Sequence, residues 1–175
     1  MKYSTYHIHE DRIVFDYYEF YFSSLRKNKV LTLDRIKEVD FTTFPYSMEI
    51  DDGEVIFFNH DDKSTIRDFA EKHNILESKK IDVWKLFCET FLDTEIEAAV
   101  LEENRVRLKK LGFSLAEQEK IKKRIQWSLF GTWEWVYLGH WDVLAMKQAR
   151  NPFYRLNGAD FYWWTMDIAL KGKTI

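Results

Sequence analysis

The segment from Ser128 to Lys147, with the sequence SLFGTWEWVYLGHWDVLAMK, is apolar on almost every side. A helix that contacts water along one side shows a stripe of apolar residues, whereas a helix that is apolar all round is surrounded by protein. We therefore expect this segment to lie at the centre of the fold. Six of the seven tryptophans lie beside, within or after it, at positions 127, 133, 135, 141, 163 and 164. The second half of the chain is expected to pack around it.

The composition is that of a chain that folds around an ordinary apolar core. Aromatic residues make up 17% of the 175 positions, and there are only 6 Gly and 2 Pro, which argues against low-complexity disorder. The single cysteine, Cys88, excludes an internal disulfide and fits a reducing compartment. The N-terminus lacks the apolar stretch of a signal peptide, and no run of about 18 apolar residues could span a bilayer. We expect a cytoplasmic bacterial protein without a membrane span.

Residues 2–59 show the two-residue period that is typical of β-strands. Apolar side chains alternate from Ile13 to Tyr17 and again from Ile36 to Phe41, and aromatic residues are frequent. The sequence YSMEIDDGEVIFF places two apolar runs on either side of a turn that ends in Gly53, and glycine readily adopts the positive φ of a tight hairpin. The pattern in this half of the chain predicts an antiparallel meander of about five or six strands.

One helix is expected after this meander. Ser64 can cap it, and its apolar face consists of Ile66, Phe69 and Ala70. Strands followed by one helix, over residues 13–74, resemble a pleckstrin-homology-like module. That family has seven strands, so the resemblance requires the N-terminus to supply the rest.

From residue 81 onward the apolar period becomes that of helices. A first helix carries on one face Trp84, Phe87, Cys88 and Phe91. Thr94 with Glu97, and Ser114 with Glu117, have the spacing of capping boxes that start a second and a third helix. Gly112 is well placed to end the second helix.

The remaining helices follow from their apolar faces. The third helix would bury Leu115, Ile121, Ile125 and Leu129, and a last helix from Asp160 to Leu170 would bury Phe161, Trp164 and Ile168. Thr132 can cap the aromatic helix, and Asn151-Pro152 would end it. The sequence therefore predicts an α+β fold. An antiparallel sheet with one helix covers residues 1–75, residues 76–80 form a connection, and an aromatic-rich helical unit packed on the sheet covers residues 81–175.

Two segments resemble a family of uncharacterised bacterial proteins. The first is DVWKLFCETFLDTE, which ends in FLDTE at Glu95, and the second is WEWVYLGHWDVL, which starts at Trp133 and has the pattern WEWxYLGxWDxL. Together with KEVDFTTFPYSMEI before them, they carry the resemblance over most of residues 30–145. This family brings no assigned activity, catalytic residue or ligand, so the resemblance implies a single unit and leaves the function open.

A carboxylate–imidazole site is the enzymatic alternative. Its candidate residues are Asp93, Glu95, Glu134, His140 and Asp142. On one continuous helix, Glu134, His140 and Asp142 would point to different faces, because successive residues are about 100° apart. A break at Gly139 would let them converge with the two residues of the FLDTE segment and hold a divalent ion, as in a metal-dependent hydrolase. The competing interpretation is that they form hydrogen bonds within an aromatic core. We expect no bound metal or organic cofactor.

The other reactive side chains have simple structural interpretations. His7 and His9 would share one face of a strand, but no carboxylate or cysteine with a clear ligand spacing accompanies them, so they are expected on the surface. Cys88 is expected to be a small buried hydrophobic residue, because a nucleophilic thiol needs a partly exposed, electropositive setting.

Basic residues are concentrated between Arg105 and Arg124. They could contact phosphates, so a nucleic-acid-binding adaptor is a further alternative. A solvated helical face is the competing interpretation, and the pI of 6.0 is low for a nucleic-acid-binding domain. We expect nucleic acid to be an unlikely partner.

The interpretation we favour is a non-enzymatic module that binds another protein. An antitoxin or immunity partner of a bacterial effector is one such module. Residues 1–75 carry an excess of acidic side chains, and the chain has more aromatic residues than one core of this size needs. The expected binding surface is the outer face of the sheet at Tyr17, Tyr18, Phe20, Tyr21 and Phe22, where the alternation fails. Self-association through the same face is the competing interpretation.

Overall fold

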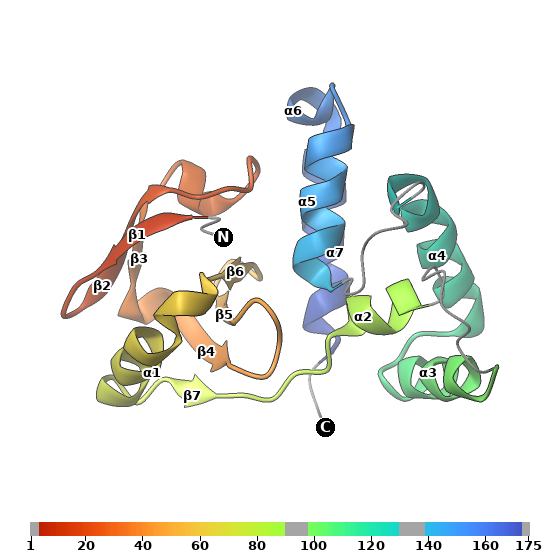
Figure 1. Cartoon of the computed structure of the whole chain (residues 1–175), viewed down its shortest axis with the longest axis horizontal. Coiled ribbons are helices and arrows are strands. Elements are labelled where there is room, and N and C mark those ends of the chain that lie inside the picture. The colour runs from red at the N-terminus through yellow and green to blue at the C-terminus, as the bar shows by residue number, and fades with distance from the viewer. Residues whose placement is uncertain (1–3, 90–97, 130–138, 173–175) are drawn as a thin grey trace.

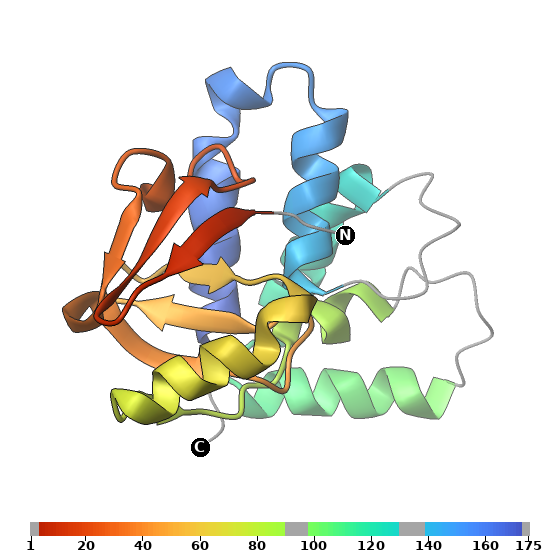
Figure 2. The same ribbon diagram turned by 60° about the vertical axis from the view of Figure 1, so that its left-hand side comes forward.

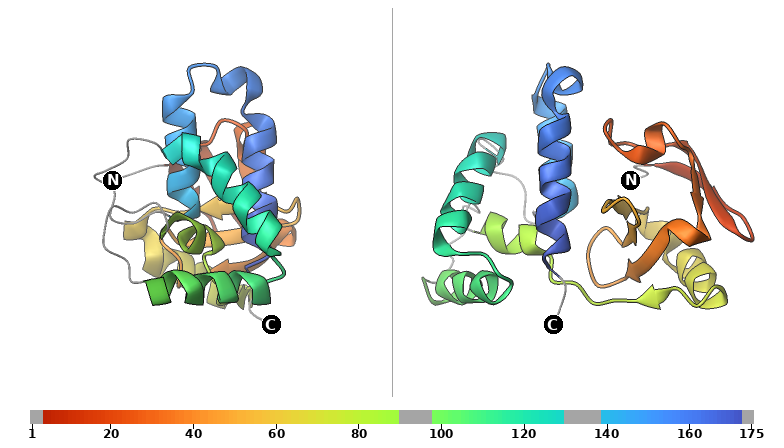
Figure 3. Two further views of the ribbon diagram at one scale, coloured as in Figure 1. Left: turned by 90° about the vertical axis from the view of Figure 1, so that its right-hand side faces the viewer. Right: turned by 180° about the vertical axis from the view of Figure 1, so that it is seen from behind.

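A computed structural model describes residues 4–89, 98–129 and 139–172, together with the side chains of these residues except 98 and 127–129. The fold is α+β, as expected, with strands in the N-terminal half and helices in the C-terminal half. Figure 1 shows three parts side by side: the strands with α1, the helix pair α5 and α7, and the group of α2, α3 and α4. The same order is visible from behind in Figure 3.

The strands form two sheets instead of the single meander that the sequence predicts. The first sheet has the order β1–β2–β3 and is antiparallel, with strands Thr5–Ile8, Arg12–Tyr17 and Val30–Thr32. The second has the order β6–β5–β4–β7, with strands Val55–Phe57, Ser47–Ile50, Ile36–Asp40 and Leu76–Glu77. β7 runs parallel to β4, and the other pairs are antiparallel. The 3-10 turn Leu33–Arg35 redirects the chain between β3 and β4, and so separates the sheets.

The hairpin and the helix of the N-terminal half lie where the sequence predicts them. Gly53 has φ +71°, and its N–H donates to the carbonyl oxygen of Ile50 at 3.1 Å, which closes the β5–β6 turn. Helix α1, Lys63–Lys72, follows the 3-10 turn His60–Asp62 and buries its predicted apolar face. Ser64 lies inside α1 and does not cap it, because the N-cap position is Asp62, two residues earlier than predicted.

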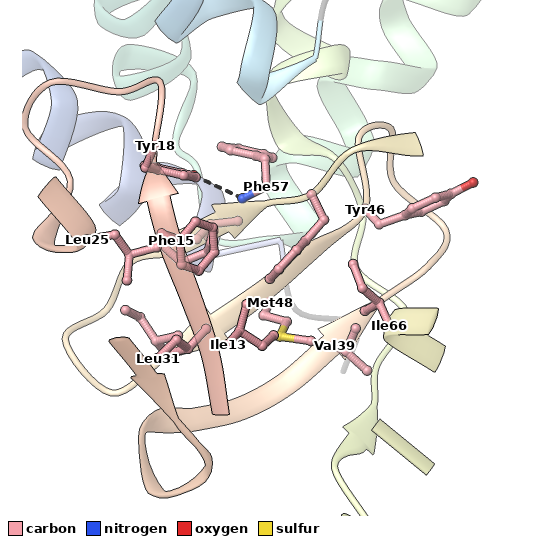
Figure 4. Packing of buried hydrophobic residues seen from close by; sticks show 14 of the residues in the cluster. Ile13, Phe15, Tyr18, Leu25, Leu31, Val39, Tyr46, Met48, Phe57 and Ile66 are labelled. Atoms are coloured by element: carbon pink, nitrogen blue, oxygen red, sulfur yellow. Dashed lines mark hydrogen bonds between the residues drawn. The ribbon is translucent and has the colours of Figure 1, made fainter. Parts of the chain in front are cut away.

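The first hydrophobic core fills the space between the two sheets, α1 and one side of the α5–α7 pair. Ile13 and Phe15 of β2 face Met48 of β5 and residues of β4 and α1 in this core (Figure 4). The backbone N–H of Phe57 donates to the Tyr18 hydroxyl at 3.0 Å, so a buried polar group has its partner. The alternate apolar positions of β2 and β5 therefore contribute Ile13, Phe15, Met48 and Ile50 to this core.

Capping groups define the helices of the third part. Asp82 accepts hydrogen bonds from the backbone N–H groups of the first turn of α2, Val83–Cys88. Helix α3 spans Ala98–Lys110, and Gly112 with φ +89° ends it as predicted. Helix α4 spans Leu115–Leu129, and the predicted capping box is present, since Ser114 and Glu117 exchange side-chain and backbone hydrogen bonds. The predicted cap at Thr94 and the apolar residue Phe91 lie outside the described residues.

The aromatic segment is not one continuous helix. Helix α4 ends at Leu129, and helix α5, His140–Arg150, begins after Gly139, whose φ of −104° and ψ of −168° are those of extended backbone. Trp133 and Trp135 lie outside the described residues. The chain continues through the short helix α6, Tyr154–Asn157, into α7, Ala159–Leu170.

Helices α5 and α7 lie next to each other and are joined through α6 (Figure 2). This pair contributes to two cores. Leu144, Tyr162 and Met166 belong to the first core. The opposite sides of α5 and α7 contribute to the second core, whose members on these two helices are Val143, Met146, Phe161 and Ile168. Trp84 and Phe87 of α2 complete the second core together with apolar residues of α3 and α4. The described end of the aromatic segment is therefore central, as the sequence predicts.

Candidate functional site

The aromatic stretch after β2 divides into buried and exposed side chains. Tyr18 and Phe20 have exposed fractions of 1% and 0%, so the prediction that they belong to a binding surface is wrong. The chain leaves the sheet after Tyr17 and turns, which directs these two rings into the first core. Tyr17 and Tyr21 are exposed, at 50% and 38%, and Phe22 is half-buried.

Two arginines stack with the exposed tyrosines. The guanidinium carbon of Arg26 lies 5.4 Å from the ring centre of Tyr17 and 5.7 Å from that of Tyr21. The guanidinium of Arg155, from α6, lies 5.3 Å from the Tyr21 ring. Tyr17, Tyr21, Arg26 and Arg155 together are called here the tyrosine–arginine face. Figure 3 shows its loop on the side of the strands that faces α5 and α6.

The loop that carries Tyr21 is fixed to helix α5 by one glutamine. The side-chain oxygen of Gln148 accepts the backbone N–H of Tyr21 at 2.9 Å, and its side-chain nitrogen donates to the carbonyl oxygen of Glu19 at 2.9 Å. The indole N–H of Trp141 donates to the Glu19 carboxylate at 2.6 Å. Three hydrogen bonds to α5 therefore set the position of the loop.

A hollow of about 300 Å³ lies within the tyrosine–arginine face. Its lining includes Glu19, Gln148 and Tyr154 as well as the four residues of the face. Burial raises the pKa of the Glu19 carboxyl to about 7, and the Trp141 hydrogen bond lowers it less. The Tyr154 hydroxyl is buried without a hydrogen-bond partner among the described residues, and burial raises its pKa to about 12, so it stays protonated. Titratable groups with shifted pKa values make this hollow a candidate binding site.

A second hollow, of about 790 Å³, adjoins the first. Its lining consists of Tyr21, Phe22, Ser23, Ser24, Arg26, Lys27, Ala159 and Trp163. Tyr21 and Arg26 line both hollows and form the wall between them. The first hollow is mainly polar, and the second is bounded by aromatic rings.

His140 and Asp142 lie together at the start of α5, but each has a structural role. His140 is buried, its ring is stacked on Trp84 with centres 6.0 Å apart, and burial lowers its pKa to about 3. The Asp142 carboxylate accepts the backbone N–H of Gly139 at 2.9 Å and so caps α5. Burial raises the pKa of Asp142 to about 6.

The remaining residues of the predicted carboxylate–imidazole site, Asp93, Glu95 and Glu134, lie outside the described residues. Within the described ranges, no three histidine, cysteine or acidic side chains are grouped so that they could hold a metal ion. The carboxyl that does lie beside His140 is Asp82, which also accepts the backbone N–H of His140 and whose pKa burial raises to about 6. Asp82 and His140 both line a small cavity of about 30 Å³, which is large enough for a water molecule.

The other predicted groups take part in local interactions. The Nε2 atom of His7 lies 3.0 Å from the Asp16 carboxylate on the surface of the first sheet, and His9 lies after β1. Cys88 is fully buried, which raises the pKa of its thiol. In the basic stretch 105–124, Arg105 and Arg107 pair with glutamates of the same helix, and Arg124 stacks on Trp164 at 4.0 Å.

No family model, curated protein or solved structure matches this chain. Among the described helices, none combines the length and the apolar character that a membrane span requires.

The sequence indicated Tyr17 and Tyr21 as site residues because the alternation fails there. It gave no signal for Arg155 or Tyr154, because they lie at the other end of the chain and reach the face only through packing of α5 and α6.

Proposed function

We propose that this protein is a module that binds another protein through the tyrosine–arginine face. One observation carries the proposal: the guanidinium groups of Arg26 and Arg155 stack with exposed Tyr21, and neither forms an ion pair among the described residues. Tyrosine and arginine are enriched at the energetic centres of interfaces, because they combine a large, stiff contact area with directional donors.

The apolar side chains of the neighbouring turn support this proposal. Phe153 and Leu156, on either side of Tyr154 and Arg155, are exposed at 63% and 84%. A protein partner would shield these apolar side chains from water and would also contact the polar residues around them, whereas a small solute would leave them exposed. That the partner is a bacterial effector stays a prediction from the sequence.

Partner capture with variants of the face tests the proposal. The full chain is used as bait in lysate of the native host, in parallel with the variants Tyr21→Ala and Arg155→Ala. If these residues are interface centres, each variant should retain the partner about 30-fold less well, which corresponds to about 2 kcal/mol. The matched control is Leu115→Ala, which removes an apolar side chain that is 55% exposed on α4.

Two outcomes would contradict the proposal. In the first, the face variants and the control retain every captured protein equally. In the second, light scattering shows a dimer of the isolated chain that Tyr21→Ala converts to a monomer, which would assign the face to self-association. Circular dichroism of each variant verifies that the fold is intact.

A further inference from the structure

The two arginines of the tyrosine–arginine face indicate the chemistry of its partner. Arg26 and Arg155 lie on one tyrosine ring, and one nitrogen of Arg26 donates to the carbonyl oxygen of Tyr18 at 3.4 Å. The Arg155 side chain is exposed and has no hydrogen-bond partner among the described residues, so its donors are available to a ligand. Two guanidinium groups close together attract an anion, and arginine forms two parallel hydrogen bonds with a carboxylate.

A buried hydroxyl gives an independent indication of a ligand at the same hollow. Tyr154 is 2% exposed, lines the polar hollow, and its hydroxyl has no partner among the described residues. A buried donor without an acceptor is unfavourable, and an acceptor oxygen from a ligand or water relieves the cost. A carboxylate supplies such oxygens, whereas an amine or an apolar group does not.

The second hollow adds an apolar requirement. Phe22 and Trp163 bound it, and the small side chain of Ala159 leaves it open at the start of α7. Because Tyr21 and Arg26 separate the two hollows, a ligand that fills both must carry its acidic and apolar groups next to each other. Neighbouring residues of a short peptide meet this condition where its backbone bends, because the bend brings to one side two side chains that point to opposite faces in an extended strand.

We infer that the partner presents a short segment in which an acidic residue is adjacent to a large apolar one. Its carboxylate binds between Arg26 and Arg155, and its apolar side chain enters the hollow at Phe22 and Trp163. This inference rests on the proposed function and specifies the chemical class of its partner.

Capped tetrapeptides test the inference with the full chain. The probe is acetyl-Gly-Asp-Leu-Gly-amide, and the matched peptides replace the aspartate by asparagine or the leucine by alanine. Binding is followed through the indole N–H signal of Trp163 in ¹⁵N-labelled protein, which the variant Trp163→Phe identifies. The Asp-Leu peptide should shift this signal in a saturable way, with a Kd of about 1 mM or below, and each matched peptide should bind about tenfold more weakly.

Protein variants assign the two groups of the peptide separately. Arg155→Gln should weaken the Asp-Leu peptide about tenfold and leave the Asn-Leu peptide unchanged, because it removes a charge-assisted bond. Ala159→Leu fills the apolar hollow and should weaken both peptides that carry leucine. The control is Arg67→Gln, since Arg67 also stacks on a ring, that of Phe41, but is paired with Glu77.

Equal affinity for the Asp-Leu and Asn-Leu peptides would overturn the inference, and so would the absence of a saturable shift at about 5 mM peptide. If Tyr21→Ala nevertheless abolishes partner capture, the proposed function stands and only this partner chemistry is wrong. If capture is insensitive to Tyr21→Ala while the peptides discriminate as expected, the hollow binds acidic segments but is not the site that retains the captured protein.

Discussion

Truncation of Trp84 tests whether the second core holds the helical part against the α5–α7 pair. Trp84 has no exposed surface, and its indole N–H donates to the carbonyl oxygen of Thr165 in α7 at 3.1 Å. Its ring is stacked on His140 of α5 and contacts Trp164 edge-on, with ring centres 5.5 Å apart. One side chain of α2 therefore contacts both central helices.

The expected cost of Trp84→Ala is about 4 kcal/mol. Loss of a buried tryptophan costs about 3–5 kcal/mol from transfer to water and the cavity that remains. The hydrogen bond of the indole N–H contributes about 1 kcal/mol, part of which is already included in this range, so we expect a value in the upper half of the range. Trp84→Phe keeps most of the ring contact but loses the N–H donor, so about 2 kcal/mol is expected. Leu115→Ala, on the surface of α4, should change the free energy of unfolding by less than about 0.5 kcal/mol.

Urea denaturation followed by circular dichroism and by tryptophan fluorescence measures these free energies. Because α5 and α7 belong to both cores, the two signals should show one transition with the same midpoint. A cost of Trp84→Ala below about 1.5 kcal/mol would refute the central position of Trp84. Two separated transitions in the parent protein would refute the shared role of α5 and α7.

Three further predictions follow from particular groups. Folding raises the pKa of the Glu19 carboxyl from 4.5 to about 7. Between these pH values Glu19 keeps its proton in the folded state and loses it in the unfolded state. The contribution of Glu19 to the free energy of unfolding therefore falls as pH rises from 4.5 through 7. The variant Glu19→Gln should therefore have a free energy of unfolding about 1–2 kcal/mol higher than that of the parent protein at pH 8, a value discounted for the partial exposure of Glu19. At pH 4.5 the two free energies should be almost equal. Equal increases at both pH values in urea melts would contradict this. Tyr162→Phe removes the hydroxyl that donates to buried Glu54 and should cost about 1.5–3 kcal/mol in the same assay, with a cost near zero counting against that hydrogen bond. Elemental analysis of protein purified without chelator should show no stoichiometric zinc, manganese or iron, and bound metal that His140→Ala abolishes would support the hydrolase alternative instead.

Local patterns predicted the elements that depend on neighbouring residues. The β5–β6 hairpin follows from the conformational freedom of Gly53, and the start of α4 follows from the hydrogen bonds of Ser114 with Glu117. The apolar face of α1 follows from helical spacing alone. The same spacing wrongly predicted that Leu115 of α4 is buried, since this side chain is exposed. Gln118 is buried instead, and its side-chain nitrogen donates to the carbonyl oxygens of Arg105 and Phe113.

Charged residues in β4 and β5 show where alternation fails as a guide. Glu38, Asp40 and Glu49 are buried, although their spacing and charge are those of solvent-facing residues. The Lys80 ammonium lies 2.6 Å from both Glu38 and Glu49, and its backbone N–H donates to Asp40 at 2.8 Å. The pairing makes their burial possible, and it depends on a residue in the segment that was predicted as a plain connection.

The sequence by itself determined the α+β class, the succession of a strand-rich half and a helical half, and the presence of an aromatic centre, because these depend on periods of two and 3.6 residues and on capping groups within one turn. It did not reveal strand β7, which lies in the segment predicted as a connection. Only the tertiary structure decided which aromatic side chains are exposed. Tyr18 and Phe20 turn inward while Tyr21 meets Arg155, since Gln148 and Trp141 of α5 hold the loop in place. Contacts between residues so far apart in the chain have no local pattern, because they form only when the two sheets and the α5–α7 pair pack together.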